Sequence, residues 1–395
     1  MIKLIKSTFY QEAETKANLT KFINSVEQLS FGPECKKFEI NFAKYQGRKH
    51  CIFFNSGSSA NLALTQSLLN LGVLQKTDLV GFSALTWATN VMPLIQLGLK
   101  PIPIDIELDT LNVSSQKLLK IIEKYPLKAL LITNLLGFCD DLEKIKNICK
   151  LNKIILLEDN CEALGTKYKG KKLGNFGLAS TFSFYVGHHM STIEGGAVCT
   201  DNTELARMLK MVRAHGWDRH LSPDERQTLK NNHKIKDFHA NYTFYDLAYN
   251  LRPTEINGFL GNNQIQYLDE IIKNRHNNFI KLADMIYNNK NFIPIKHNHI
   301  DLVSNFAFPV ICLSESIHNK LIKKCKNKLE IRPIVGGNML LQPFFKKYLL
   351  YYLGLEKLFA CPNAEMVHRQ GFYFGNNPEL TNKEIEDIKS IFLNL

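Results

Sequence analysis

Two neighbouring histidines, His188 and His189, stand in the segment STFSFYVGHHMSTIEGGAVCT that covers residues 180–200. A run typical of a buried strand precedes them, and an EGG triplet follows them. Neighbouring side chains of an extended segment point to opposite faces, and no acidic or histidine partner lies at ligand spacing, so a metal site is disfavoured. An imidazole can move a proton near neutral pH. Metal binding is therefore disfavoured, although adjacent histidines followed by EGG are unusual for a purely structural segment.

A strand end, a small-residue turn and a helix start are combined in NSGSSANLALTQSLL, residues 55–69. The N-terminus of a helix offers free N–H groups and the positive end of the helix dipole, which suits a phosphate. Gly57 permits a close approach, and Ser58 or Ser59 can add a hydroxyl. A plain helix cap explains the same residues and is the more common case on local sequence alone.

Two acids end the apolar run in ILLEDNCEALG, residues 155–165. Ligands of open α/β sheets bind at the carboxyl ends of the strands, where an acid can pair with the cation of a cofactor. A helix N-cap is the alternative explanation for an acid at this point.

Short apolar runs that alternate with helical patterns place these three segments on one sheet. The predicted strands cover residues 50–55, 78–83, 100–106, 128–134, 153–159, 179–185 and 195–200. Continuous apolar strands separated by amphipathic stretches predict βαβ units and a mostly parallel sheet covered on both faces. Residues 255–289 predict one long helix or two, and later strands and helices predict a second, smaller α+β domain. The chain ends in a helix in which Thr381 and Glu384 fit a capping box.

The composition narrows the class of protein. The 395 residues, 45% apolar and 22% charged, are typical of a globular chain of two domains. No apolar run approaches a membrane span and the N-terminus lacks an export signal, so we expect a cytoplasmic protein without membrane contact. The nine cysteines include no close pair, which disfavours a metal or iron–sulfur site. The net charge of +12 is spread along the chain, so we expect an anionic small substrate and no nucleic acid.

In this order, the three segments resemble the DegT/DnrJ/EryC1/StrS family of sugar aminotransferases and dehydratases, which are fold-type I enzymes dependent on pyridoxal phosphate. The similarity runs nearly end to end. Its segments are FGPECKKFEINFAKYQG (31–47), NSGSSANLAL (55–64), TWATNVMPLIQLG (86–98), LLGFCDDLEKI (135–145), EDNCEALG (158–165), TFSFYVGHHMSTIEGGAV (181–198), YNLRPTEINGFLGNNQI (249–265) and EIRPIV (330–335). The resemblance implies an α/β fold: a fold-type I transferase-like large domain with a mixed, mostly parallel sheet (residues 1–270) and a smaller C-terminal α+β domain (residues 271–395). The N-terminal segment is expected to pack on the small domain.

The resemblance also assigns cofactor-binding roles. Gly57, Ser58 and Ser183 match residues that hold the cofactor phosphate, and Trp87 matches the ring that stacks on the cofactor. Asp159 matches the acid that pairs with the pyridine nitrogen and keeps it protonated, so that the ring can accept electrons.

Other matched residues face the substrate or the partner subunit. Asn250 matches a residue that reaches the phosphate from a partner subunit, which implies a homodimer with shared sites. His215 and Arg219 are expected to face the substrate pocket, and Arg332 to meet the diphosphate. For these last three residues, a surface or core role explains the local sequence equally well.

One departure from the family pattern carries the functional prediction. Most members have a lysine six residues before the glutamate of EGG, where it forms a Schiff base with the cofactor. Here that residue is His188, and no lysine occurs from residue 173 to residue 209. Lysine-less members resemble sugar 3-dehydratases, which hold pyridoxamine phosphate non-covalently and use the histidine as the catalytic base. Glu162, where aminotransferases more often have glutamine beside the cofactor, fits the same branch.

The branch implies removal of the 3-hydroxyl from a nucleotide-linked 4-keto-6-deoxy sugar in deoxysugar biosynthesis for surface polysaccharide. GDP-4-keto-6-deoxymannose or a close heptose analogue is the expected substrate. L-glutamate is expected to convert pyridoxal phosphate into pyridoxamine phosphate with release of 2-oxoglutarate. Hydrolysis of the enamine product is then expected to release the 3-deoxy-4-keto sugar and ammonia. A dehydratase of CDP-4-keto-6-deoxyglucose with an iron–sulfur cluster is one alternative. The cysteines here show no close spacing that would supply the ligands of such a cluster. A nucleotide-sugar aminotransferase with a displaced lysine and a non-catalytic cofactor-binding relative are the others.

Overall fold

Seven strands form the central sheet of this protein, which we describe from a computed structural model that covers residues 1–353 and 359–393. They are β1 (His50–Phe54), β2 (Leu79–Ser83), β3 (Lys100–Ile104), β4 (Ala129–Thr133), β5 (Ile155–Asp159), β8 (Ala179–Ser183) and β9 (Gly196–Thr200). The spatial order is β1-β9-β8-β5-β4-β2-β3, and β9 alone runs against its neighbours. Every strand predicted from the apolar runs is present, with at most two residues trimmed from either end. The predicted mixed, mostly parallel sheet is confirmed.

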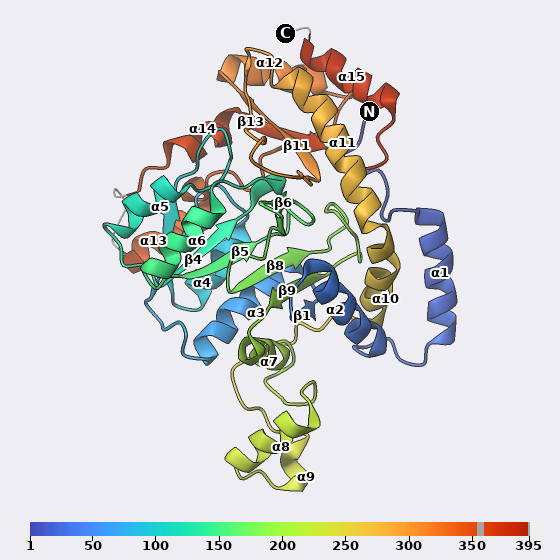
Figure 1. The fold of residues 1–395 in the computed structure, drawn as a ribbon, viewed down its shortest axis with the longest axis vertical. Helices are drawn as coiled ribbons and strands as arrows, with labels where there is room; N and C mark the ends of the chain where they lie inside the picture. Colours follow the sequence, from blue (N-terminus) through green and yellow to red (C-terminus); the bar gives the residue numbers. More distant parts are fainter. Residues whose placement is uncertain (354–358, 394–395) are drawn as a thin grey trace.

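Helices cover both faces of this sheet, as expected for strands that are apolar on both sides (Figure 1). In β4, Ala129 and Leu131 pack with α3 and α7, whereas Leu130 and Ile132 pack on the opposite face with α5 and α6. The helices of this part are α1 (Glu12–Ser25), α2 (Pro33–Gln46), α3 (Gly57–Asn70), α4 (Met92–Gln96), α5 (Ser115–Ile122), α6 (Leu142–Leu151), α7 (Thr203–Val212), α8 (Pro223–Asn232), α9 (Asp237–Ala240) and α10 (Glu255–Gln264). Between β5 and β8 lies a short hairpin of β6 (Lys167–Tyr168) and β7 (Lys171–Lys172). Helices α8 and α9 project away from the rest of the chain.

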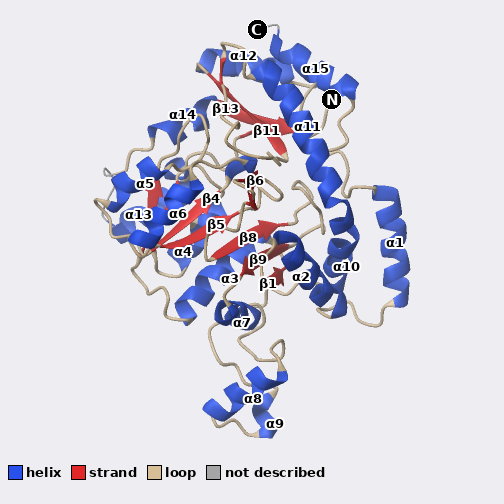
Figure 2. Ribbon diagram, in the orientation of Figure 1, coloured by secondary structure: helices blue, strands red, loops and turns tan. Residues whose placement is uncertain are grey.

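A second, antiparallel sheet has the order β10-β11-β13-β12. Its strands are β10 (Phe292–Ile293), β11 (Ala307–Cys312), β12 (Ile331–Pro333) and β13 (Gly371–Gly375), and its part of the chain contains the helices α11 (Leu268–Ile286), α12 (Glu315–Cys325), α13 (Pro343–Leu353), α14 (Pro362–Gln370) and α15 (Asn382–Leu393). The helical stretch predicted for residues 255–289 is the pair α10 and α11, which runs from the large sheet to the small one (Figure 2). The capping box of the last helix is confirmed, because Glu384 N–H donates to Thr381 Oγ1 and Thr381 N–H donates to Glu384 Oε2.

The first residues of the chain join the small sheet. Ile2 N–H donates to the carbonyl of Lys328, and Glu330 N–H donates to the carbonyl of Ile2, which gives a parallel bridge beside β12. Residues 4–10 then run past the loop that carries His188. The domain boundary at residue 270 stays a prediction. Among the described helices, none is long and apolar enough to cross a membrane.

Strand alternation sends the two acids at the end of β5 to opposite sides. Asp159 faces the cavity described below, whereas Glu158 is fully buried beneath the sheet. Glu158 Oε1 accepts the N–H groups of Phe176 (2.7 Å) and Gly177 (2.7 Å), and its Oε2 accepts Gly174 N–H at 2.9 Å. One carboxylate thus holds the turn that leads into β8, and with it the position of Ser183.

We expect Glu158→Gln to lower the free energy of unfolding by about 2–4 kcal/mol, because an amide nitrogen would face backbone N–H donors inside the core. Denaturant unfolding followed by circular dichroism measures this loss. Glu386→Gln is the control, since Glu386 is 70% exposed in a surface ion pair and should change stability by less than about 0.5 kcal/mol. Equal effects of the two changes would contradict this role of Glu158.

Candidate active site

A cavity of about 370 Å³ lies at the carboxyl ends of the parallel strands, where the small sheet closes over the large one. This is the edge at which open α/β sheets bind ligands. Eight of the residues singled out in the sequence line it: Gly57, Ser58, Trp87, Asp159, Glu162, Ser183, His188 and Arg332. The fold therefore brings together side chains that lie up to 275 positions apart in the sequence.

The turn from β1 into α3 forms one wall of the cavity. Ser56 caps the helix, because its Oγ accepts Ser59 N–H at 3.0 Å. Within the described part of the chain, the N–H groups of Gly57 and Ser58 have no hydrogen-bond acceptor and face the cavity. A Cβ on Gly57 would lie 2.7 Å from Ser183 Cβ, so a side chain at residue 57 would push into the cradle. The helix cap is thus present, and it leaves the N–H groups of Gly57 and Ser58 available to an anion.

The carboxylate of Asp159 forms the floor of the cavity and is 3% exposed. Its Oδ2 accepts the amide of Asn61 at 3.1 Å, and its Oδ1 accepts Cys161 N–H at 2.9 Å. Among the described residues no cation pairs with it. A buried carboxylate with neutral partners is suited to a cationic ligand group.

Glu162 lies close to Asp159 and is 8% exposed. Its Oε2 accepts Leu136 N–H at 2.9 Å. Burial raises the pKa of Glu162 to about 8, and the negative charge of Asp159 adds to this rise. At neutral pH this side chain is therefore a carboxylic acid that can donate a hydrogen bond into the cavity.

The imidazole of His188 is confined between two rings. The ring of Phe306 stacks on it at 5.1 Å between centroids and an angle of 20°, and the ring of Tyr185 meets it edge-on at 6.0 Å. Burial lowers the pKa of His188 to about 4, although Asp159 opposes this shift. Its Nδ1 is buried and has no partner among the described residues. At neutral pH the ring is therefore an uncharged base.

Arg332 enters the cavity from β12 of the small sheet. Its Nη2 donates to Glu330 Oε1 at 3.0 Å, while Glu330 Oε2 accepts Leu4 N–H at 3.0 Å. The guanidinium remains partly exposed and free to meet an anion. At the other side of the opening, Trp87 is 53% exposed, so most of one ring face is available for stacking.

Three of the predicted residues lie outside this cavity. Asn250 is exposed, and its Oδ1 accepts Arg252 Nε at 3.0 Å. His215 packs edge-on against Trp217 at 4.9 Å. The guanidinium of Arg219 lies over Trp217 at 4.0 Å and over Tyr242 at 4.9 Å. The chain alone does not bring these residues to the residues around His188.

Several cavity residues were missed in the sequence. Leu4, Phe306, Val335 and Tyr373 come from the N-terminus and the small sheet, and local sequence gave no signal for them. Tyr185 and Glu194 flank His188 within its own motif and could have been named. Among the described residues, no group of three or more histidine, cysteine, aspartate or glutamate side chains could hold a metal ion.

The sheet order with its single reversed strand, and the cavity between the two sheets, define an α/β protein of the fold-type I transferase-like class. The sequence profile of the DegT/DnrJ/EryC1/StrS aminotransferase family matches residues 10–392, and the chain belongs to this family. The resemblance seen in the motifs is thereby confirmed.

Three similar proteins share nearly the whole length of the chain. GDP-4-keto-6-deoxy-D-mannose 3-dehydratase of Yersinia pseudotuberculosis is 33% identical over 98% of this chain and 97% of the relative. The structure of the Escherichia coli GDP-4-keto-6-deoxy-D-mannose-3-dehydratase with bound hydrated PLP has a TM-score of 0.88 at 30% identity, with 99% of both chains covered. A GDP-4-keto-6-deoxymannose-3-dehydratase with a trapped PLP-glutamate geminal diamine has a TM-score of 0.88 at 29% identity, over 99% of this chain and all of the other.

The raised pKa of Glu162 has a measurable consequence for stability. Between about pH 4.5 and pH 8 the folded chain keeps a proton on Glu162 that the unfolded chain has lost, so stability falls as the pH rises. One such proton corresponds to about 1.4 kcal/mol per pH unit at most. We expect Glu162→Gln to remove this slope, measured by denaturant unfolding without added ligand at several pH values. Parallel curves for the two proteins would show that Glu162 is ionised in the fold.

Proposed function

We propose that this chain is a 3-dehydratase that uses pyridoxal and pyridoxamine phosphate and acts on a nucleotide-linked 4-keto-6-deoxy sugar. GDP-4-keto-6-deoxymannose or a close heptose analogue is the proposed substrate. The observation that carries the proposal is the occupant of the Schiff-base position, where His188 borders the cavity. No lysine lines this cavity within the described part of the chain. The names of the relatives that match over the full length support the same activity.

The residues around the cavity fit the cofactor. The free N–H groups of Gly57 and Ser58 would hold the phosphate, the unpaired carboxylate of Asp159 would hold the pyridinium, and the open face of Trp87 would stack on the ring. When bound, the pyridoxamine form supplies an amine that condenses with the 4-keto group and a ring that accepts electrons while the 3-hydroxyl leaves.

His188 is the base of the proposed reaction. It is neutral at physiological pH, because burial lowers its pKa to about 4, and it can take a proton from the methylene carbon of the cofactor. The rings of Phe306 and Tyr185 restrict its movement. Glu162, as a neutral acid, would donate a hydrogen bond beside the cofactor. Arg332 would meet the diphosphate of the sugar nucleotide, since a guanidinium matches phosphate oxygens.

L-glutamate is the proposed donor that restores the pyridoxamine form, with 2-oxoglutarate as its product. The neighbour with a trapped PLP-glutamate species supports this choice. The products are then a 3-deoxy-4-keto sugar and ammonia, and the sugar would enter the synthesis of surface polysaccharide in the cytosol, where nucleotide sugars are made. An iron–sulfur dehydratase is less well supported, because the nine cysteines are free and dispersed.

A homodimer with shared sites is the second part of the proposal. Three predicted residues lie outside the cavity of their own chain. His215 and Arg219 precede the projecting helices α8 and α9, and Asn250 follows them (Figure 1). The two aromatic rings beside Arg219 hold its guanidinium at the surface. A partner subunit would bring these side chains to a second cavity.

Purified protein given pyridoxal phosphate, glutamate and GDP-4-keto-6-deoxymannose should form 2-oxoglutarate, ammonia and the 3-deoxy-4-keto sugar, as measured by mass spectrometry and coupled assays.

His188→Asn should lower kcat by about 10² to 10⁴ and leave cofactor binding intact, because asparagine cannot transfer the proton. An amino sugar as the product would identify an aminotransferase. A requirement for a reductase would identify the iron–sulfur type.

Shared sites can be tested by mixing two inactive variants. His188→Asn and Asn250→Ala each impair both sites of their own homodimer, whereas a mixed dimer would contain one site with neither change. We therefore expect activity to return when the two variants are unfolded together and refolded, up to about a quarter of the parental value for random pairing of subunits. Mixing His188→Asn with Glu162→Gln is the control, since both residues border the same cavity and no intact site would form.

A further inference from the structure

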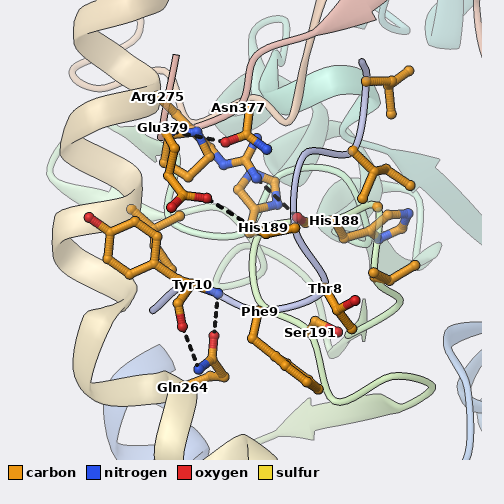
Figure 3. A pocket seen from close by; sticks show the side chains of 17 residues that line it. Thr8, Phe9, Tyr10, His188, His189, Ser191, Gln264, Arg275, Asn377 and Glu379 are labelled. Atoms are coloured by element: carbon orange, nitrogen blue, oxygen red, sulfur yellow. Dashed lines mark hydrogen bonds between the residues drawn. The ribbon is translucent and has the colours of Figure 1, made fainter. Parts of the chain in front are cut away.

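A buried arginine lies behind the loop that carries His188 (Figure 3). Arg275 projects from α11 and is 5% exposed. None of the ion pairs between described residues involves it, and its Nε has no hydrogen-bond partner there. Burial lowers its pKa to about 9, so it keeps its charge at neutral pH. A buried charge without a counterion is costly, and its remaining contacts must compensate.

Among the described residues, the side chain of Arg275 donates its hydrogen bonds to backbone carbonyls only. Arg275 Nη2 donates to the carbonyl of His188 at 3.1 Å, and Nη1 donates to the carbonyls of Phe306 (3.2 Å) and Asn376 (2.6 Å). The side chain of Asn376 donates in return to the carbonyl of Arg275 at 2.8 Å. One planar guanidinium therefore joins α11, the His188 loop, the start of β11 and the end of β13.

Two of these contacts concern the same imidazole. Arg275 fixes the backbone of His188, and it also fixes the backbone of Phe306, whose ring stacks on the imidazole of His188 at 5.1 Å. One side chain thus contacts the backbone of the histidine and the backbone of the residue whose ring stacks on it. Arg275 lines a small pocket between the His188 loop and the N-terminal segment (Figure 3), and it is not among the residues that line the 370 Å³ cavity.

We propose that Arg275 is a positioning residue for His188, which holds the imidazole in place through the backbones of His188 and Phe306. This inference rests on the proposed function, in which His188 is the base. The simpler alternative is a purely structural role, in which Arg275 only links α11 to the small sheet. The chain offers a matched control for that role one turn further along α11, where Asn278 is 7% exposed and donates to the carbonyl of Asn377 at 3.0 Å without touching His188.

The charge of Arg275 also disfavours the protonated form of His188, in addition to the effect of burial. Other titratable groups line the cavity or the small pocket that His188 borders: Tyr10, Asp159, Cys161, Glu162, Tyr185, His189, Glu194, Arg332, Tyr373 and Glu379. A change of Arg275 leaves these groups in place. The pKa of His188 therefore reports on the charge of Arg275, which a change of an uncharged structural residue such as Asn278 leaves in place.

The test compares the full-length variants Arg275→Met, Arg275→Lys and Asn278→Ala. Methionine is similar in length and donates no hydrogen bond, so kcat should fall about 10- to 100-fold, because small misplacements of a catalytic group carry such costs, with a smaller change in KM. In the protein without cofactor, NMR titration of the imidazole of His188, assigned by comparison with His188→Asn, should show a raised pKa. Lysine keeps the charge, so Arg275→Lys should keep the pKa near the parental value and lose part of kcat. Asn278→Ala should keep both values.

A parental kcat and a parental pKa of His188 in folded Arg275→Met would overturn the proposal. If Arg275→Met does not fold, a parental kcat of folded Arg275→Lys would overturn the proposal instead. An equal loss of kcat in Asn278→Ala would also overturn it, because Arg275 would then have a purely structural role. The NMR titration needs no substrate, so it tests Arg275 even if the parental protein proves to have no dehydratase activity, which would instead refute the proposed function.

Discussion

The unpaired carboxylate of Asp159 is the constraint on which the rest of the site depends. It stands at the end of β5, inside the sheet, with an amide and a backbone N–H as its partners. Taking an ionised carboxylate out of water without a cation costs several kcal/mol. A cationic ring bound above it would recover that cost, so binding energy for the proposed cofactor is already stored in the fold. The cradle of α3 and the opening beside Trp87 lie around this point.

The small sheet sets the electrostatics of the same cavity. Tyr373 of β13 and Phe306, directly before β11, line one side of it, and burial acts in opposite directions on two groups. It lowers the pKa of His188 and raises that of Glu162, so that both are uncharged at neutral pH. One becomes a base and the other an acid within a single cavity. The environment of the cavity thus provides an uncharged base and a neutral acid at the same pH.

The sequence predicted the large sheet well, because seven apolar runs separated by helical patterns leave little choice of architecture. It also located the residues that directly follow strands, such as Gly57 and Asp159, since the edge of a parallel sheet collects them. It could not locate Phe306 or Tyr373, whose approach to His188 depends on how two sheets pack. Arg275 was equally hidden: it lies in IIKNRHNNFIK, where a basic residue is typical of a solvated helix face. Its burial follows from the tertiary fold alone.

Loss of the lysine and sharing of the site are physically linked in this scheme. A covalent bond retains a cofactor regardless of its other contacts, whereas in the proposed site a chain with His188 would retain it through the turn before α3, Asp159 and stacking on Trp87. Trp87 is 53% exposed, and its open face is the one proposed to stack on the cofactor. Each Å² of apolar surface that a partner subunit covers adds about 25 cal/mol, and a hydrogen bond from Asn250 to the phosphate would add to it. A histidine at residue 188 would therefore make the contacts of the proposed shared site more important for holding the cofactor.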